Sequence, residues 1–558
     1  MKPLTFNTAT FLLGSSMFAT GATGLVLEYI QGAVGAYILG NSIEQYSIVI
    51  GLMLFMMGVA AKIQRWFGDE LLIEKFILIE TFLALIGGWS PLATYWAFGV
   101  TDHFKLVQYI FIMSIGLLIG LEIPVVMRIN ERYAAKLSLN IERVFSADYI
   151  GSLVGALLWV YVLLRKFPLT ESSFLLAGVN FTIAVITYLY FLNRGMIARK
   201  YMIIGLIVVT AASLVYGYRH NRSWNLQLEQ RLYDDPMIFT RTTRYQHLVM
   251  THNRQMDEYR FYINGNLQFS SMDEHRYHEL LVHPAMNLVP DHRRVLILGG
   301  GDGLALREVL KYTGVREVFL VDLDPEMTAI GANHPVLREL NGGAFDDARV
   351  TAAASEAVTT GELYPLFQET GETDKKSRLP VTEEIASVRV MNVDADRFLS
   401  GTKGRWNVVL VDLPDPTSVD LVKLYSRSFY RKIRGVLAER GIVAVQATSP
   451  YHAKQSFLCI GRTLEAAGLS TLPYHENVPS FGEWGWFLGW RDHLGAEPLH
   501  RKIGDMGIDV PTRYLTPDLF KRTLVFGKGE LESPDTDVNT LMFPVLLNYY
   551  LKESWLAD

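Results

Sequence analysis

Seven long apolar segments occupy the first 218 residues of this 558-residue chain and limit what it can fold into. Each is near the ~20 residues that a helix needs to cross a bilayer. The first segment is too long and too rich in glycine for a simple cleaved signal peptide. The sequence therefore predicts an N-terminal all-α transmembrane bundle of about seven helices in residues 1–218, at about 8–30, 43–63, 71–95, 104–127, 145–164, 169–192 and 201–218.

Basic residues between these segments gather in alternate loops, and such loops are retained in the cytoplasm. Because seven is an odd number of crossings, residues 219–558 are then expected on the opposite side, facing the periplasm or the cell exterior. The sequence thus predicts a multi-pass protein of the cell (inner) membrane, with the bilayer as a partner. The basic loops hold Lys62, Arg65 and Lys75, then Arg128, Arg132, Lys136 and Arg143, then Arg194, Arg199 and Lys200; the intervening loops hold only Lys105, then Arg165 and Lys166.

Five acidic residues lie in or beside the apolar segments: Glu28, Glu44, Glu80, Glu122 and Asp148. Acids at membrane depth can form a path or a site for a cation. They can equally anchor helix ends or form hydrogen bonds between helices, and both interpretations stay open. Glu80 is the least easily explained as an anchor because it lies in the middle of its segment.

Charge and cysteine content exclude several classes of site. The net charge of −5 gives no indication of nucleic acid as a partner. A single cysteine, Cys459, excludes an intrachain disulfide framework and a cysteine-rich metal centre. We find no metal-ligand spacing and predict no metal site, and assembly into a homo-oligomer stays open.

The part of the chain after residue 218 has the pattern of an α/β protein. Residues 219–233 are polar and are expected to be a linker, and residues 234–290 a small β-hairpin domain with a turn at Asn264–Gly265. From residue 291 to 558, apolar strands alternate with helices, which predicts a Rossmann-like, doubly wound sheet. Strands are expected at 295–298, 318–321, 388–393, 406–411, 441–446 and 485–490. A polar insertion at about 351–388 interrupts the pattern and is expected to be mobile, or a lid.

A glycine-rich turn, Gly299–Gly303, joins the first of these strands to a helix. Such a turn lets a ligand approach backbone N–H groups at the start of a helix. A dinucleotide fingerprint would place a third glycine where Leu304 stands, which argues against NAD or FAD. Asp302 within the turn would repel a pyrophosphate and attract a cation. A nucleoside carrying a sulfonium group fits this turn better.

Acidic residues follow several strands of the expected sheet. Asp302, Asp322, Asp394 and Asp412 each stand at a strand end, and Asp415 is close to the last of them. Ligands of such sheets bind beyond the carboxyl ends of the strands. These acids therefore predict a negative cleft that attracts a polycation and excludes phosphates.

Four motifs together resemble spermidine synthase, that is, the polyamine aminopropyltransferase family. They are GGGDG at 299–303, DLPDP at 412–416, YHE at 277–279 and NGNLQ at 264–268. The resemblance covers about residues 234–490, and the N-terminal half resembles the multi-pass region of membrane-bound members. It implies a class I methyltransferase-type sheet preceded by a small β domain. It also implies transfer of an aminopropyl group from decarboxylated S-adenosylmethionine, a co-substrate, to a diamine, with no cofactor. Putrescine is the expected diamine, giving spermidine and 5′-methylthioadenosine.

The resemblance also implies residue roles. Asp412 matches the catalytic base, and Tyr277 is expected to orient the amine. The donor-binding positions are Gln246, His278, Gly299, Gly301, Asp302, Asp322, Asp394 and Ala395, and the acceptor-binding positions are Gln268, Asp415 and Phe481. The sequence departs from the family pattern at Leu413 and Pro414, which replace small hydroxyl residues, at Ala395, which replaces a glycine, and at Phe481, which replaces a tyrosine. These departures leave the identity of the acceptor open.

Two other functions are compatible with this pattern. A methyltransferase that uses intact S-adenosylmethionine shares the fold, although Asp302 would repel the carboxylate of that cofactor. A polyamine transporter or sensor would need the acidic cleft but no base, whereas Asp412 and Tyr277 are both present. The membrane side also stays open, because the donor is made in the cytoplasm in known polyamine synthesis and the loop charges favour the outside.

Overall fold

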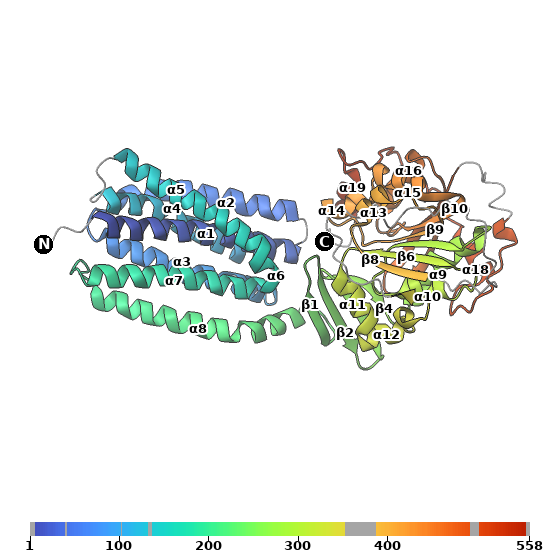
Figure 1. Ribbon diagram of the computed structural model, residues 1–558, viewed down its shortest axis with the longest axis horizontal. Helices are drawn as coiled ribbons and strands as arrows, with labels where there is room; N and C mark the ends of the chain where they lie inside the picture. The colour runs from blue at the N-terminus through green and yellow to red at the C-terminus, as the bar shows by residue number, and fades with distance from the viewer. Residues whose placement is uncertain are drawn as a thin grey trace, which may run out of the picture. The chain divides into compact units, whose positions relative to one another are not determined.

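The computed structural model describes residues 6–39, 42–101, 103–131, 137–351, 387–491 and 502–553. The chain divides into two compact units, Met1–Met237 and Ile238–Asp558 (Figure 1). The polar insertion expected at 351–388 lies almost entirely outside the described residues, so its expected role as a lid stays a prediction.

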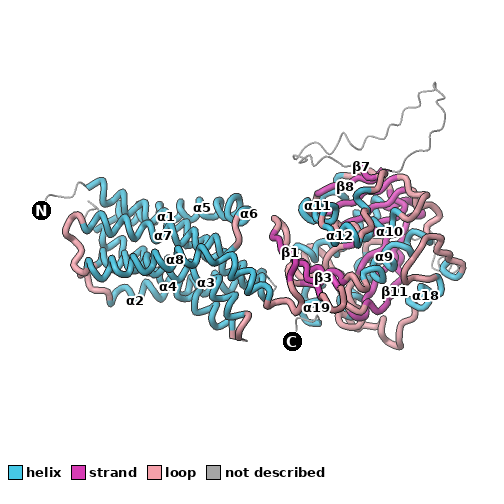
Figure 2. Tube along the Cα trace, turned by 90° about the horizontal axis from the view of Figure 1, so that it is seen from below, coloured by secondary structure: helices cyan, strands magenta, loops and turns pink. Residues whose placement is uncertain are grey.

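The first unit is built from helices alone (Figure 2). Among the described residues of this unit, seven helices are long and apolar enough to cross a membrane, in agreement with the seven segments of the sequence. The fifth continues from α5 through a π-helical turn into the short α6. The helices are α1 (Phe6–Leu39), α2 (Ser42–Ile63), α3 (Leu72–Phe98), α4 (Phe104–Glu131), α5 (Leu137–Leu158), α6 (Leu164–Lys166), α7 (Leu169–Leu192) and α8 (Lys200–Gln230).

The surface of this helical unit is apolar and its interior is partly polar. Large apolar side chains such as Phe55 and Val209 are 64% and 66% exposed. Inside, the carboxyl groups of Glu80 and Glu122 are adjacent and both side chains are buried. Thr20 of α1 donates a hydrogen bond to Glu122 of α4, so at least one of the acids in the spans joins two helices.

Residues 219–230, which we expected to be part of a linker, continue helix α8. The polar end of α8 packs on its neighbours, since Trp224 lies against Trp89 of α3 with ring centroids 5.9 Å apart. Asn225 also donates a hydrogen bond to Thr170 of α7. The linker prediction was wrong here because polarity marks where a helix loses its apolar surface, not where it ends.

The second unit begins with a four-stranded antiparallel sheet in the order β1-β2-β3-β4. The predicted hairpin turn joins β3 to β4, and Asn264 and Gly265 both have positive φ there, as such a turn requires. Side chains of this sheet pack against helices α11 (Pro325–Asn333) and α12 (Pro335–Leu340). The strands are β1 (Met237–Thr242), β2 (His247–Asn253), β3 (Glu258–Ile263) and β4 (Asn266–Ser270).

An eight-stranded sheet forms the centre of the second unit, in the order β11-β12-β10-β9-β5-β6-β8-β7. Strands β5, β6, β7, β8, β9 and β10 are parallel. At one edge, β12 pairs antiparallel with β10, and β11 pairs antiparallel with β12. We predicted one strand near the end of the domain and the structure has two. The strands are β5 (Arg294–Gly299), β6 (Glu317–Asp322), β7 (Val350–Thr351), β8 (Ser387–Asn392), β9 (Trp406–Asp412), β10 (Leu437–Gln446), β11 (Ser470–Val478) and β12 (Gly482–Trp490).

Helices cover both faces of this sheet, as the term doubly wound implies (Figure 1). Alternate residues of β5 point to opposite faces, so Val295 belongs to one hydrophobic core and Leu296 to the other. The first core is shared with α9 (Glu274–Leu288), α10 (Leu304–Leu310) and α18 (Pro517–Thr523). The second is shared with α13 (Ala395–Gly401), α15 (Arg427–Val436), α16 (Lys454–Ala466) and α19 (Val545–Glu553).

Candidate active site

A cavity of about 810 Å³ lies at the carboxyl ends of the central strands. Strands β5 and β9 are neighbours, with Gly299 opposite Asp412. The strand that follows β5, β6, lies toward one edge of the sheet, and the strand that follows β9, β10, lies toward the other edge. The order of strands therefore reverses here, which opens a crevice beyond the strand ends. Every residue that the sequence assigned to the site lines this cavity: Gln246, Gln268, Tyr277, His278, Gly299, Gly301, Asp302, Asp322, Asp394, Ala395, Asp412, Asp415 and Phe481.

The glycine turn after β5 is as tight as its sequence suggests. Gly299 has a φ of +88°, and a Cβ there would lie 1.8 Å from the carbonyl oxygen of Asp412. A Cβ on Gly301 would lie 2.7 Å from Oδ2 of Asp322, whose carboxylate accepts the Gly301 N–H at 3.0 Å. These two positions need glycine, because the backbone carbonyl of Asp412 from β9 and the carboxylate of Asp322 from β6 both approach the turn closely.

The pKa values of two acids at the glycine turn are raised. Burial raises the pKa of Asp322 to about 7, against the N–H groups of Asp324 and Gly301 that donate to it. Burial also raises the pKa of Asp302 to about 6, against the positive charge of His278. Carboxylates shifted toward neutral pH in a cleft are typical of functional sites.

The first turns of α9 bring a tyrosine to the end of β9. The Tyr277 hydroxyl donates a hydrogen bond of 2.8 Å to Oδ1 of Asp412. Burial raises the pKa of Asp412 above its ordinary value, against the charge of His278 and this hydrogen bond. Asp412 thus becomes a better proton acceptor than an exposed aspartate, and it faces the cavity with a fixed orientation.

His278, the next residue of α9, is held as a cation. Its Nδ1 lies 3.0 Å from Oε2 of Glu274, which also receives two hydrogen bonds from Arg307. Burial disfavours the charged imidazole, but the hydrogen bond and charge of Glu274 outweigh it and raise the pKa of His278 to about 9. For Glu274, the hydrogen bonds and positive charges of His278 and Arg307 outweigh burial and lower its pKa to about 2.

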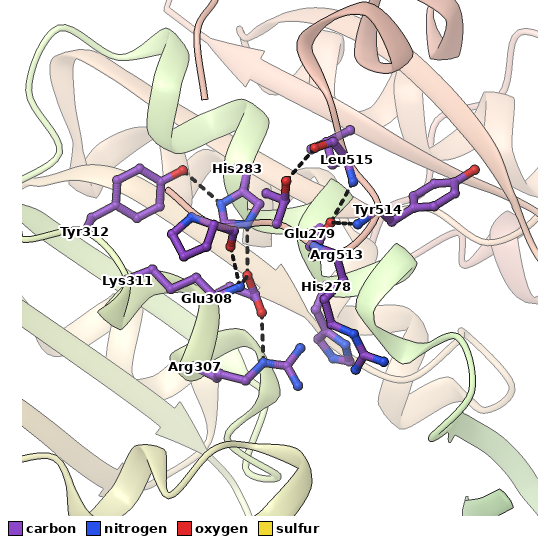
Figure 3. A network of polar contacts seen from close by, with 12 residues as sticks. His278, Glu279, His283, Arg307, Glu308, Lys311, Tyr312, Arg513, Tyr514 and Leu515 are labelled. Carbon is purple, nitrogen blue, oxygen red and sulfur yellow. Dashed lines mark hydrogen bonds and ion pairs between the residues drawn. The ribbon is translucent and has the colours of Figure 1, made fainter. Parts of the chain in front are cut away.

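A polar network behind α9 fixes the helix that presents Tyr277 (Figure 3). His283 is fully buried between Glu308, at 2.8 Å from its Nε2, and the Tyr312 hydroxyl, at 2.8 Å from its Nδ1. Arg307 joins the two halves of the network, because it contacts both Glu308 and Glu274. Buried polar groups satisfied in this way hold neighbouring elements in one arrangement.

Asp415 is surrounded by three hydrogen-bond donors from two parts of the chain. Its carboxylate accepts from Gln446 at 3.3 Å, Thr448 at 3.3 Å and Tyr550 at 2.8 Å. Burial raises the pKa of Asp415 to about 6, against these donors. Thr448 has a φ of +59°, which is rare for a β-branched residue and typical of strain at functional sites. We did not predict these three partners, although Gln446 is the last residue of β10, because a glutamine at a strand end does not by itself indicate a site.

The cleft is less negative than the sequence suggests. Lys423 contacts Asp394 at 3.0 Å, and the same carboxylate accepts the Arg397 N–H at the start of α13, next to Ala395. Burial disfavours ionisation of Asp394, but these two contacts outweigh it and lower its pKa. Together with the protonated His278, Lys423 places positive charge among the strand-end acids. No local sequence pattern indicates this pairing, because Lys423 and Asp394 are 29 residues apart in the chain.

The remaining predicted residues, Phe481, Gln268 and Gln246, also line the cavity. Phe481 lies edge-on to the Tyr277 ring with centroids 6.1 Å apart, and Trp484 packs on Phe481. Gln268 donates a hydrogen bond to the Asn266 carbonyl, and Gln246 is held through its backbone by Thr243. Within the described ranges, no group of three or more His, Cys, Asp or Glu side chains is arranged to hold a metal ion.

Known proteins are similar in sequence to this chain over nearly its full length. The model of the spermine/spermidine synthase domain matches residues 274–360 and 377–497. Polyamine aminopropyltransferase 1 of Ralstonia nicotianae is 37% identical over 99% of this chain and 97% of its own length. The polyamine aminopropyltransferase of Oceanobacillus iheyensis is 36% identical over 95% and 94%. The crystal structure of spermidine synthase from Thermotoga maritima matches 53% of this chain and 87% of its own, with 21% identity and a TM-score of 0.41. On the length and identity of the sequence matches, the chain belongs to the polyamine aminopropyltransferase family and is an aminopropyltransferase.

Proposed function

We propose that this enzyme transfers the aminopropyl group of decarboxylated S-adenosylmethionine to a short diamine, with putrescine as the acceptor. The products are then spermidine and 5′-methylthioadenosine. The observation that carries the proposal is the hydrogen bond between Tyr277 and Asp412 inside the cavity at the strand ends. It joins a buried proton acceptor to a group that can orient an amine, which a binding protein would not need.

The donor is assigned to the glycine-turn side of the cavity. Asp322, at the end of β6, suits the ribose hydroxyls, and Asp394 with Ala395 suits the adenine side. Asp302 suits the terminal amine of the donor, with Gln246, His278, Gly299 and Gly301 completing the binding surface. Asp302 would face the carboxylate of intact S-adenosylmethionine, and like charges disfavour that ligand.

The acceptor is assigned to the side of Asp415, with Gln268 and Phe481 as further contacts. A diamine nitrogen is protonated in water, with a pKa near ~10 by analogy with lysine, and has no lone pair to attack with. Asp412 takes that proton, and Tyr277 orients the freed nitrogen. The nitrogen lone pair attacks the propyl carbon next to the sulfonium, the carbon–sulfur bond breaks, and sulfur keeps that electron pair as the neutral thioether of 5′-methylthioadenosine. Binding both substrates in line supplies much of the rate.

The activity can be tested with the full chain purified in detergent. Labelled decarboxylated S-adenosylmethionine is supplied with a panel of diamines of increasing length, and labelled polyamine products are separated and identified. We expect turnover with putrescine. Transfer to another diamine only would refute the choice of acceptor, and methyl transfer from intact S-adenosylmethionine would refute the reaction. If the purified chain binds the labelled donor but shows no turnover with any diamine, the catalytic assignment is refuted.

We also propose that the seven apolar helices span a membrane, with residues 238–558 on the side opposite the basic loops. The exposed apolar side chains of Phe55 and Val209 support contact with lipid. The odd number of helices supports a location of residues 238–558 on the side opposite the basic loops. Alkaline phosphatase and a fluorescent protein, each fused after Asp558 in separate chains, report the side. Active phosphatase with a dark fluorescent protein is expected. The reverse pair would place the catalytic unit in the cytoplasm and refute the proposed topology.

A further inference from the structure

The last part of the chain reaches the acceptor side of the cavity. The match to the family domain ends at residue 497, and helix α19, Val545–Glu553, lies well beyond it. Tyr550 of α19 nevertheless lines the cavity and is only 7% exposed. A residue outside the part matched by the family-domain model therefore lines the cavity in this chain.

Helix α19 is fixed against the catalytic unit by specific contacts. Leu546 is completely buried in the core on that face of the sheet. Oε2 of Glu553 accepts the backbone N–H of Gln455 at 2.8 Å, at the start of α16. Before the helix, the Asn539 side chain donates to the carbonyls of Val422 and Tyr425 at 3.0 and 3.1 Å. These contacts determine where the Tyr550 hydroxyl lies.

The Tyr550 hydroxyl donates to Oδ2 of Asp415 at 2.8 Å. The other two donors to this carboxylate, Gln446 and Thr448, are both 3.3 Å away. Hydrogen bonds to a charged group contribute more than those between neutral groups. Of the three contacts that orient Asp415, the one from Tyr550 is the shortest. Phe481, which lines the same cavity, has no hydroxyl group that could donate a hydrogen bond.

We propose that Tyr550 is a positioning residue of the acceptor site, which holds the Asp415 carboxylate in the orientation that binds the terminal ammonium group of the diamine. The inference rests on the acceptor role of Asp415 in the proposed function. It assigns to the C-terminal segment of this chain a direct part in the recognition of the amine.

The charge of Asp415 depends on its donors. The titratable groups that face it are Tyr277 of α9, Tyr425 of the turn Lys423–Tyr425 and Tyr550 of α19, which are all neutral near pH 7. Hydrogen bonds to the ionised carboxylate oppose the effect of burial, which raises the pKa of Asp415 to about 6. Loss of the Tyr550 hydroxyl would raise this pKa further, so that the protonated form, which cannot attract an ammonium, gains weight at neutral pH.

The test compares Tyr550→Phe with Tyr549→Phe in the full chain. Tyr549 is the adjacent residue of α19, and its hydroxyl contacts Asp537 instead of the site. For Tyr550→Phe we expect KM for putrescine to rise about 10-fold, with kcat changed less than about 2-fold, from the loss of one hydrogen bond to a charged group. The acid limb of kcat/KM for the amine should move to higher pH, and the Kd of the donor should stay unchanged. Tyr549→Phe should match the native enzyme in every measurement.

Asp415→Asn separates this inference from the proposed function. If Asp415→Asn raises KM for the amine while Tyr550→Phe changes neither KM nor the acid limb, Tyr550 has no positioning role and the inference is overturned. If Asp415→Asn itself leaves KM unchanged, the acceptor role of Asp415 fails, and the inference fails with it. A loss of donor binding in Tyr550→Phe, in parallel with the rise in KM, would show a general structural role and would also overturn it.

Discussion

Replacing Asp412 with asparagine should remove the proton acceptor and leave the shape of the site almost unchanged. Asparagine has the same size, and its side-chain oxygen can still accept the Tyr277 hydroxyl, which is 2.8 Å from Oδ1 in the native enzyme. The backbone of residue 412, which pairs with Gly299, is not altered. The substitution therefore isolates the proton transfer from the positioning of the substrates.

The expected loss follows from the chemistry of a general base. Such groups contribute about 10²–10⁴-fold to the rate, which corresponds to about 3–5 kcal/mol of activation free energy. The burial that raises the pKa of Asp412 brings it closer to that of the amine, which places this site within that range rather than below it. Because Asp412 is assigned to the transfer step, the Kd of the donor should change little.

Single-turnover rates and calorimetric donor binding, both on the full chain in detergent, measure the two quantities separately. Asp396→Asn is the matched control, because Asp396 of α13 pairs with Lys432 of α15 at 2.7 Å and does not line the cavity. A single-turnover rate for Asp412→Asn above about one tenth of native would show that the proton leaves by another route, since a base contributes at least ~10²-fold. A large loss in Asp396→Asn would mean that the assay reports on folding.

Three further substitutions test the electrostatics of the catalytic unit. Asp302→Asn should weaken binding of decarboxylated S-adenosylmethionine. It should also reduce the enzyme's preference for this donor over intact S-adenosylmethionine, because the negative charge that repels the carboxylate is gone. A calorimetric ratio of the two Kd values equal to that of the native enzyme would contradict this. Donor binding should weaken about 10-fold per pH unit as pH falls below the Asp322 pKa of about 7, because the protonated acid no longer accepts both ribose hydroxyls, and Asp322→Asn should flatten this dependence. A native Kd that is constant from pH 5 to about 8 would refute it. His278, with a folded-state pKa of about 9 against 6.5, should contribute about 3 kcal/mol of stability that is complete below pH 6.5 and is lost as pH rises through 9. Proteolytic unfolding of the native enzyme and His278→Gln across this window measures it, and equal slopes would exclude the contribution.

Local sequence patterns determined most of the architecture. An apolar helix of membrane length and a parallel strand bounded by a glycine turn are both signalled by residues close together in the chain. The carboxyl ends of parallel strands meet at one edge of a sheet, so the strand-end residues Asp322 and Asp412 could be placed in one site before any contact was known. The strand β11 was not predicted because it contains Pro473 and polar residues, which are tolerated since β11 is an edge strand that pairs only with β12.

Only the tertiary structure determined the partners of the site residues and their charge. Tyr550 reaches Asp415 across 135 residues of sequence, and Lys423 reaches Asp394 across 29, so no local pattern could signal either contact. The charge of His278 likewise depends on its burial and on a carboxylate that Arg307 holds in place. The sequence supplied the candidate site residues because strand ends are local features. Their pKa values and orientations required the folded chain, because burial and contacts between distant segments set them.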